Sequence, residues 1–103
     1  MKIPTYRRDV IIVIGSVTTA PEHAEEALAH SLRHVQRSRL EPGCISHDVH
    51  RHAEDPLRLV FVERWQDRAA VDAHFAVPDS GEFVKAVGVL ASQPPEMAIY
   101  TVS

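Results

Sequence analysis

The amino-acid sequence predicts an α+β domain of the ferredoxin-like type, a split βαβ arrangement with one antiparallel sheet. Three observations carry this prediction. A run rich in β-branched residues at 10–17 is followed by a helical apolar stripe at 21–39. Two strand-like segments, 44–52 and 57–65, flank a turn and therefore form a hairpin. A second helical region and a final strand then complete the β-α-β-β-α-β order.

The first strand and first helix follow from local residue preferences. Val10 to Ile14 is apolar at every position, so both faces of this strand are expected to be buried. Pro21 and Glu22 suit the first turn of a helix, and Glu41-Pro42-Gly43 ends it. The predicted inward stripe of this helix consists of Ala24, Ala27, Leu28, Ser31, Leu32 and Val35.

The second half of the chain has equally clear signals for where helices begin and end. Asp67 is the expected N-cap of a helix that presents Ala70, Val71, His74 and Phe75 on one side. Pro78 interrupts this helix. The spacing of Asp79 and Glu82 predicts a capping box for a further helix. Its expected stripe is Phe83, Val84, Val87, Leu90 and Ala91. Pro94-Pro95 stops it, and 97–102 is the last strand.

Length, charge and cysteine content limit the classes of protein. With 103 residues, one domain at 9–103 preceded by a polar arm at 1–8 is expected. The net charge of −3 argues against nucleic acid or an anionic membrane as partner. The apolar run near the start is too short for a signal peptide or a membrane span. With Cys44 as the lone cysteine, these features favour a cytoplasmic protein.

The segment 57–65 predicts a homodimer. Leu57, Leu59 and Phe61 point to one side, while Val60 and Val62 point to the other. In a ferredoxin-like fold the helices cover only one sheet face, so the other face is left as a large apolar patch. A second subunit is the simplest cover. The alternative is a monomer whose open face is screened by the N-terminal arm.

A set of short motifs in a fixed order resembles the antibiotic biosynthesis monooxygenase family. The resemblance spans about residues 9–102, and its most specific part is Glu63-Arg64-Trp65 followed nine residues later by His74. The motifs are Pro42-Gly43-Cys44, Val49-His50-Arg51, Asp55-Pro56, Phe61-Val62-Glu63-Arg64-Trp65, Ala73-His74-Phe75, Pro95-Glu96 and Tyr100. The resemblance implies a dimeric α/β barrel. It also implies oxidation of phenols, anthrones or hydroquinones without flavin, haem or metal.

The haem-degrading branch of the same family fits poorly. Those relatives use an asparagine in the first strand and a histidine ligand in the second helical region. The matching positions here are Gly15 and a segment, 82–88, that contains no histidine. No glycine-rich phosphate loop is present in the sequence either. We therefore expect no cofactor.

The resemblance indicates His74 and Trp65 as catalytic residues. His74 would transfer a proton or donate a hydrogen bond near neutral pH, and Trp65 would shape the pocket and contact oxygen. Phe61 and Glu63 share a strand face with Trp65, and Val71 and Phe75 lie beside His74, so these four are expected to bind substrate. Each has an ordinary alternative: His74 and Trp65 as core residues, and Glu63 as the partner of an arginine.

The remaining histidines are expected to be structural or solvated. His30 and His34 have a spacing that can bind zinc, but two histidines on one helix are a weak signal. His47 lies on the opposite strand face from His50 and His52, which is typical of a polar strand end. No metal site is expected.

The leading functional hypothesis is a cofactor-independent monooxygenase that oxidises a small electron-rich aromatic, such as a hydroquinone or anthrone, with dioxygen. An ionised substrate of this kind reduces dioxygen directly, so the protein need only deprotonate and enclose it. Two alternatives stay open because fold does not fix function. One is a non-catalytic dimeric module, small-molecule-binding or stress-related. The other is an isomerase or lyase of the wider α/β barrel group.

Overall fold

A computed structural model describes residues 1–102; Ser103, at the end of the predicted domain, lies outside the described residues. Residues 1–102 form four strands and three α-helices, with a short 3₁₀ turn at Pro21–His23 before the first helix. The elements are β1 (Ile11–Thr18), α1 (Ala24–Ser38), β2 (Cys44–Arg51), β3 (Arg58–Trp65), α2 (Arg68–Ala76), α3 (Pro78–Leu90) and β4 (Glu96–Thr101).

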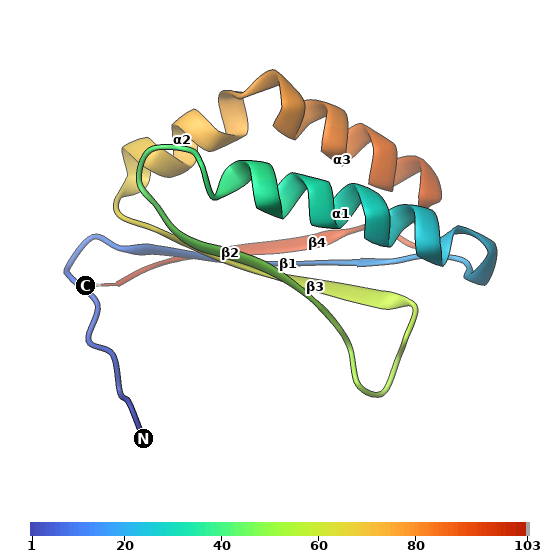
Figure 1. Ribbon diagram of the computed structural model, residues 1–103, viewed down its shortest axis with the longest axis horizontal. Helices are drawn as coiled ribbons and strands as arrows, with labels where there is room; N and C mark the ends of the chain where they lie inside the picture. Colours follow the sequence, from blue (N-terminus) through green and yellow to red (C-terminus); the bar gives the residue numbers. More distant parts are fainter. Residues whose placement is uncertain (103) are drawn as a thin grey trace.

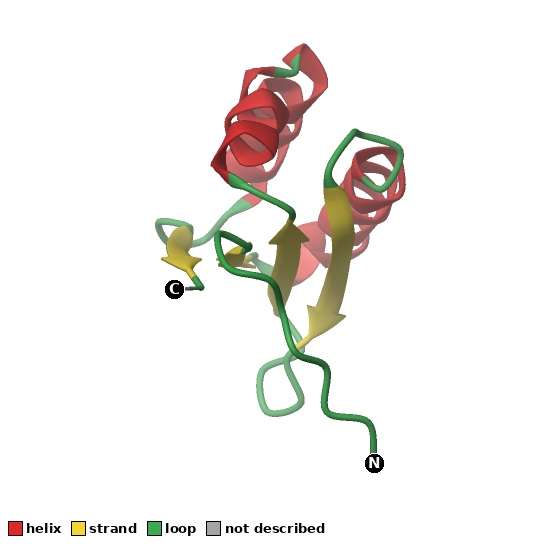
Figure 2. Cartoon of the chain, turned by 90° about the vertical axis from the view of Figure 1, so that its left-hand side faces the viewer, coloured by secondary structure: helices red, strands yellow, loops and turns green. Residues whose placement is uncertain are grey.

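The four strands form one antiparallel sheet in the order β2-β3-β1-β4. All three helices lie on the same side of this sheet (Figure 1). Figure 2 shows the same arrangement from another side, with the helices packed on one side of the strands. This is the split βαβ topology that the sequence predicts, so the fold class is confirmed.

The two sheet faces differ in burial. On the face beneath the helices, called the covered face here, Val13, Leu59, Phe61 and Trp65 are all buried. The opposite face, called the open face, carries Ile12, Ile14, Val60, Val62, Ala98 and Tyr100. Ile14 is 42% exposed and Tyr100 is 54% exposed. Within one chain, β1 is therefore buried on one face only, and burial of its second face depends on the predicted partner subunit.

Helix α1 is rotated relative to the predicted stripe. Its buried residues are Ala27, Ser31, His34, Val35 and Ser38, whereas Leu32 is 42% exposed. The serines can face inward because their hydroxyls donate to backbone carbonyls one turn back, Ser31 to Ala27 at 2.7 Å and Ser38 to His34 at 2.8 Å. The predicted stripe included Ser31 but missed His34 and Ser38, the other polar residues of this buried face.

The second helical region begins as expected and then departs from the prediction. The Asp67 side chain accepts a hydrogen bond from the Ala70 backbone at 2.9 Å, which confirms the predicted N-cap of α2. The predicted capping box at Asp79 is wrong. Helix α3 starts at Pro78 with Val77 as its N-cap, because proline fits the first helical position and sets the start of the helix there.

Candidate active site

A cavity of about 260 Å³ lies between the helices and the covered face. Phe61, Phe75 and Phe83 contribute aromatic surface to its lining. Its titratable lining residues are His34, His47, Glu63, His74 and Glu96. A mostly apolar cavity with a few convergent polar groups is the usual form of a small-molecule site.

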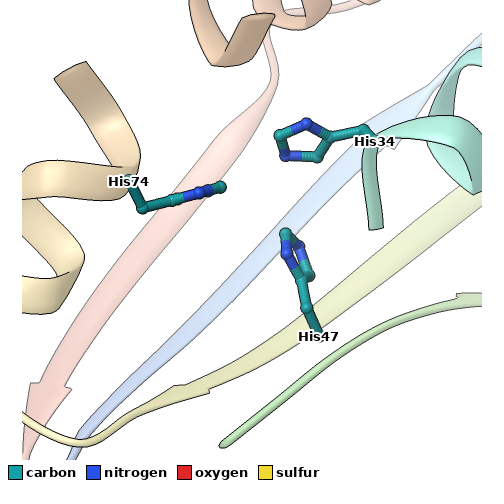
Figure 3. Close-up of side chains that lie close together, drawn as sticks. All are labelled: His34, His47 and His74. Carbon is teal, nitrogen blue, oxygen red and sulfur yellow. The ribbon is translucent and has the colours of Figure 1, made fainter. Parts of the chain in front are cut away.

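Three of these residues, His34, His47 and His74, form a compact group that we call the histidine triad. They come from α1, β2 and α2, and their rings converge on one point beneath the helices (Figure 3). The ring centroids are 5.1 Å apart for His34–His47, 5.4 Å for His34–His74 and 5.5 Å for His47–His74. All three side chains are buried, and His47 is only 1% exposed.

Two carboxylates flank His74. Its Nδ1 lies 3.0 Å from Glu41 Oε1, and its Nε2 lies 3.6 Å from Glu63 Oε1. An Nδ1–H that donates to Glu41 leaves the Nε2 lone pair free. Glu41 also accepts a hydrogen bond from Arg37 at 2.7 Å through its other oxygen. The Glu41 carboxylate therefore links α1 to the imidazole of α2.

Glu63 is buried beside the triad and is held from the sheet. Its Oε1 accepts the indole N–H of Trp65 at 2.9 Å, and its Oε2 lies 3.6 Å from His47 Nε2. Register places Glu63 directly opposite His47 on the neighbouring strand. Burial raises the pKa of the Glu63 carboxyl, while the bond from Trp65 and the nearby His74 oppose that rise.

Burial also governs the charge of the other two imidazoles. It lowers the pKa of His34 to about 3, with smaller contributions from His74 and Arg37. It lowers the pKa of His47 to about 3 as well, followed by the effects of His34 and His74. Both rings are therefore neutral at physiological pH. A neutral imidazole is the form that binds metal ions.

His34 and His47 differ in their hydrogen bonding. Arg37 Nη2 donates to His34 Nδ1 at 3.0 Å. Neither ring nitrogen of His47 has a hydrogen-bond partner among residues 1–102. Buried polar groups without partners are uncommon in folded proteins. His47 therefore stands out within the triad.

The structure brings together most of the residues that the sequence indicated. The His74 and Trp65 rings pack at a centroid distance of 4.6 Å, within one chain, as predicted. Phe61, Glu63 and Phe75 line the cavity beside His74. Trp65 and Val71 are fully buried in the adjoining apolar cluster and do not line it. The Trp65 N–H points to Glu63, so Trp65 reaches the cavity through that carboxylate.

Two site residues were assigned wrongly from the sequence. His34 was expected to be solvated and His47 to mark a polar strand end, yet both are buried in the triad. His34 lies on the part of the buried face of α1 that the predicted stripe missed. For His47 a signal existed, because Val49 shares its strand face and packs on the core. No spacing rule along the chain could join histidines from three separate elements.

Comparison with known proteins identifies the class. The sequence profile described as "Antibiotic biosynthesis monooxygenase" matches residues 10–86. The chain therefore belongs to the antibiotic biosynthesis monooxygenase family.

Individual relatives agree with this assignment. An uncharacterized Synechocystis protein, sll1783, is 37% identical over 95 residues, which cover 92% of this chain and 65% of that protein. The structure of Rv0793 from Mycobacterium tuberculosis is similar with a TM-score of 0.85 and 26% identity, covering 91% of this chain and 95% of that one. A crystal structure described as an antibiotic biosynthesis monooxygenase has a TM-score of 0.83 and 28% identity, with coverage of 90% and 98%. Among residues 1–102, no helix has the length and apolar content needed to cross a membrane.

Proposed function

We propose that this protein is a cofactor-independent monooxygenase that oxidises a small electron-rich aromatic of the hydroquinone or anthrone type with dioxygen. Membership of the family supports the general class. The observation that carries the proposal is His74, a buried imidazole on the cavity wall that is held between the carboxylates of Glu41 and Glu63.

The first step is proton transfer from the substrate. With its Nδ1–H donated to Glu41 at 3.0 Å, His74 presents the Nε2 lone pair as the base for a substrate hydroxyl or an acidic C–H group. The Glu41 carboxylate stabilises the imidazolium that forms. Phe61, Phe75 and Phe83 surround the aromatic ring of the substrate with apolar surface.

The second step is oxidation of the ionised substrate. The electron-rich anion passes electrons to dioxygen directly, one oxygen atom is incorporated into the substrate, and the other leaves as water. For an anthrone, which becomes a quinone, all four electrons come from the substrate, and no separate reductant is needed. Trp65 acts here as a positioning residue, because its N–H holds Glu63 at 2.9 Å beside the triad.

The proposal includes a homodimer whose subunits bring their open faces together. In one chain this face exposes Ile14 and Tyr100 and carries Val60 and Val62. An apolar sheet face of this extent is unusual on a monomer. Two-fold pairing would cover it without touching the triad, which lies on the covered face.

Oxygen consumption with a panel of hydroquinones and anthrones tests the proposal. His74→Ala should lower kcat/KM by about 10²–10⁴, the usual contribution of a general acid–base group. His23→Ala, in the 3₁₀ turn before α1 and away from both the cavity and the open face, is the matched control and should keep wild-type turnover. Thermal unfolding is measured on both variants.

Two results would reject the catalytic assignment. One is a destabilised His74→Ala protein with unchanged activity per folded molecule, which would leave His74 as a core residue. The other is saturable binding of the aromatics with no oxygen uptake by the wild type, which would favour the non-catalytic module.

A further inference from the structure

We propose that the histidine triad is a binding site for a single divalent transition-metal ion, with a coordination position open toward the cavity. This inference goes beyond the proposed function, which requires no metal and describes the metal-free protein, because the Nε2 lone pair of His74 cannot bind an ion and accept a proton at the same time. The expectation of no metal site rested on spacing along single elements. The triad instead takes one histidine from each of α1, β2 and α2.

The geometry of the triad suits one ion. Each histidine offers a ring nitrogen, and these three atoms lie within 4.8 Å of one another. Ligand nitrogens at about 2.0–2.1 Å from a tetrahedral ion are about 3.4 Å apart. Each nitrogen therefore needs to move inward by less than about 1 Å, a distance that small side-chain rotations provide. Three histidines on one ion leave a further position for water or a substrate oxygen.

A second, independent observation is the state of His47. Its side chain is 1% exposed, and both of its ring nitrogens lack a hydrogen-bond partner among the described residues, with Glu63 Oε2 at 3.6 Å from Nε2, just beyond hydrogen-bond distance. The ring is directed at His34 and His74 (Figure 3). An ion at the centre of the triad would give one of these two buried nitrogens the partner that the protein does not supply.

The surrounding carboxylates have the positions that a metal site requires. A metal-bound histidine almost always donates its other N–H to a carboxylate or carbonyl group. His74 has this arrangement, because Nδ1 lies 3.0 Å from Glu41 and Nε2 faces the triad side near Glu63. Together Glu41 and Glu63 place two carboxylates beside the cation, which compensates its charge in a buried setting.

His34 needs one local rearrangement. Arg37 donates to its Nδ1 at 3.0 Å, so Nε2 carries the proton in this arrangement. Coordination through Nε2 requires the other tautomer and release of that bond. Arg37 has other partners in place, with Glu41 at 2.7 Å and Asp79 at 3.6 Å. The exchange therefore costs about one hydrogen bond and weakens binding without preventing it.

The ligand chemistry selects the class of ion. Imidazole nitrogens suit zinc, cobalt, nickel and copper, whereas magnesium and calcium prefer oxygen ligands. Zn²⁺ is the reference ion for a three-histidine site with an open position. Co²⁺ is a useful probe because it accepts the same geometry and its visible absorption reports the number of ligands.

The test uses the full chain after chelator treatment and involves no substrate. Zn²⁺ is titrated by calorimetry and Co²⁺ by visible absorption. We expect one ion per chain and a Co²⁺ spectrum of low coordination number. His47→Gln should weaken binding by at least about 10–100-fold, as loss of even an outer-shell partner does. His50→Gln, on the opposite face of the same strand, is the matched control and should bind like the wild type.

Folding is checked by circular dichroism for both variants, and His34→Gln provides a second triad variant if His47→Gln does not fold. Absence of stoichiometric binding would overturn the proposal. So would equal affinity in the wild type and in a folded triad variant. Because no substrate is present, failure here leaves the oxygen-uptake proposal standing, and failure of oxygen uptake leaves the metal site standing.

Discussion

Each face of the sheet carries some residues of a kind that water would not favour there. The covered face, packed under the helices, holds the ionisable groups His47 and Glu63 next to Trp65. The open face exposes Ile14 and Tyr100 to solvent in the single chain. Burying polar groups destabilises a fold unless they are paired, and exposing apolar side chains gives up the stabilisation of burial.

This difference separates two kinds of function within one sheet. Polar groups on the covered face are costly for folding, so their concentration around one cavity points to chemistry there. Apolar groups on the open face have no chemistry to offer, so their concentration points to a partner surface. The alternation of β3 puts Glu63 on one face and Val62 on the other, one residue apart.

The largest expected effect concerns the proposed assembly of two subunits through their open faces. Val62→Asp places a charge in the middle of the open face and should convert the proposed homodimer into monomers, because a buried unpaired charge strongly opposes association. Light scattering should fall from twice the 11.5 kDa chain mass to that mass alone.

Arg51→Asp, an exposed change at the end of β2, is the control for altered charge and should leave the mass at the dimer value. A wild-type chain that is already monomeric at micromolar concentration would remove the open face as a partner surface. It would favour the alternative of a monomer whose open face is screened by the N-terminal arm.

The fold was predictable because each of its elements has a strong local signal. The β-branched run of β1 and the Asp67 cap each act through a few neighbouring residues. The orientation of α1 was harder, since two of its buried residues, His34 and Ser38, are polar, and Ser38 is accommodated by a bond to its own helix. Such polar residues look solvent-facing in a hydrophobicity pattern.

The site was predictable only in part, for a different reason. His74 and Trp65 lie on adjacent elements, and a short connection brings a strand and its following helix into contact. The triad depends on tertiary packing across α1, β2 and α2. In the sequence, His34 and His47 are 13 positions apart, and His47 and His74 are 27 positions apart. Only the folded chain shows that these side chains converge.

A second test compares a thiol at the edge of the covered face with one in solvent. Burial raises the pKa of Cys44 to about 11, and the carboxylates of Glu41 and Glu63 add to that rise. At pH 8 its thiolate fraction should therefore be about 100-fold lower than that of an ordinary thiol, and the rate of iodoacetamide alkylation should fall in proportion. The rate should rise about tenfold per pH unit up to the pKa.

The control carries Ala53→Cys in a Cys44→Ser background, which puts the thiol in the exposed turn between β2 and β3. Its alkylation at pH 8 should be fast and should level off at lower pH than that of Cys44. Equal rates for the two thiols would show that the edge of the covered face is open to solvent and ionises freely.

The smallest expected effect is a difference in the free energy of unfolding between variants of two neighbouring triad histidines, which differ in their hydrogen bonds. His74→Leu removes the donor to Glu41 and one of the two imidazoles that lie 3.6 Å from Glu63, and should lower the free energy of unfolding by about 1–3 kcal/mol. His47→Leu removes two ring nitrogens that lack partners among residues 1–102, so its free energy of unfolding should stay within about 1 kcal/mol of wild type or rise. Urea unfolding at pH 7 with a chelator present measures both, because a bound ion would add stability of its own.

If His47→Leu is destabilised as strongly as His74→Leu, the His47 ring contributes to folding through contacts other than hydrogen bonds. The triad would then be a structural cluster. A stable His47→Leu protein would instead mark His47 as a residue retained for the site, since the fold is no weaker without it.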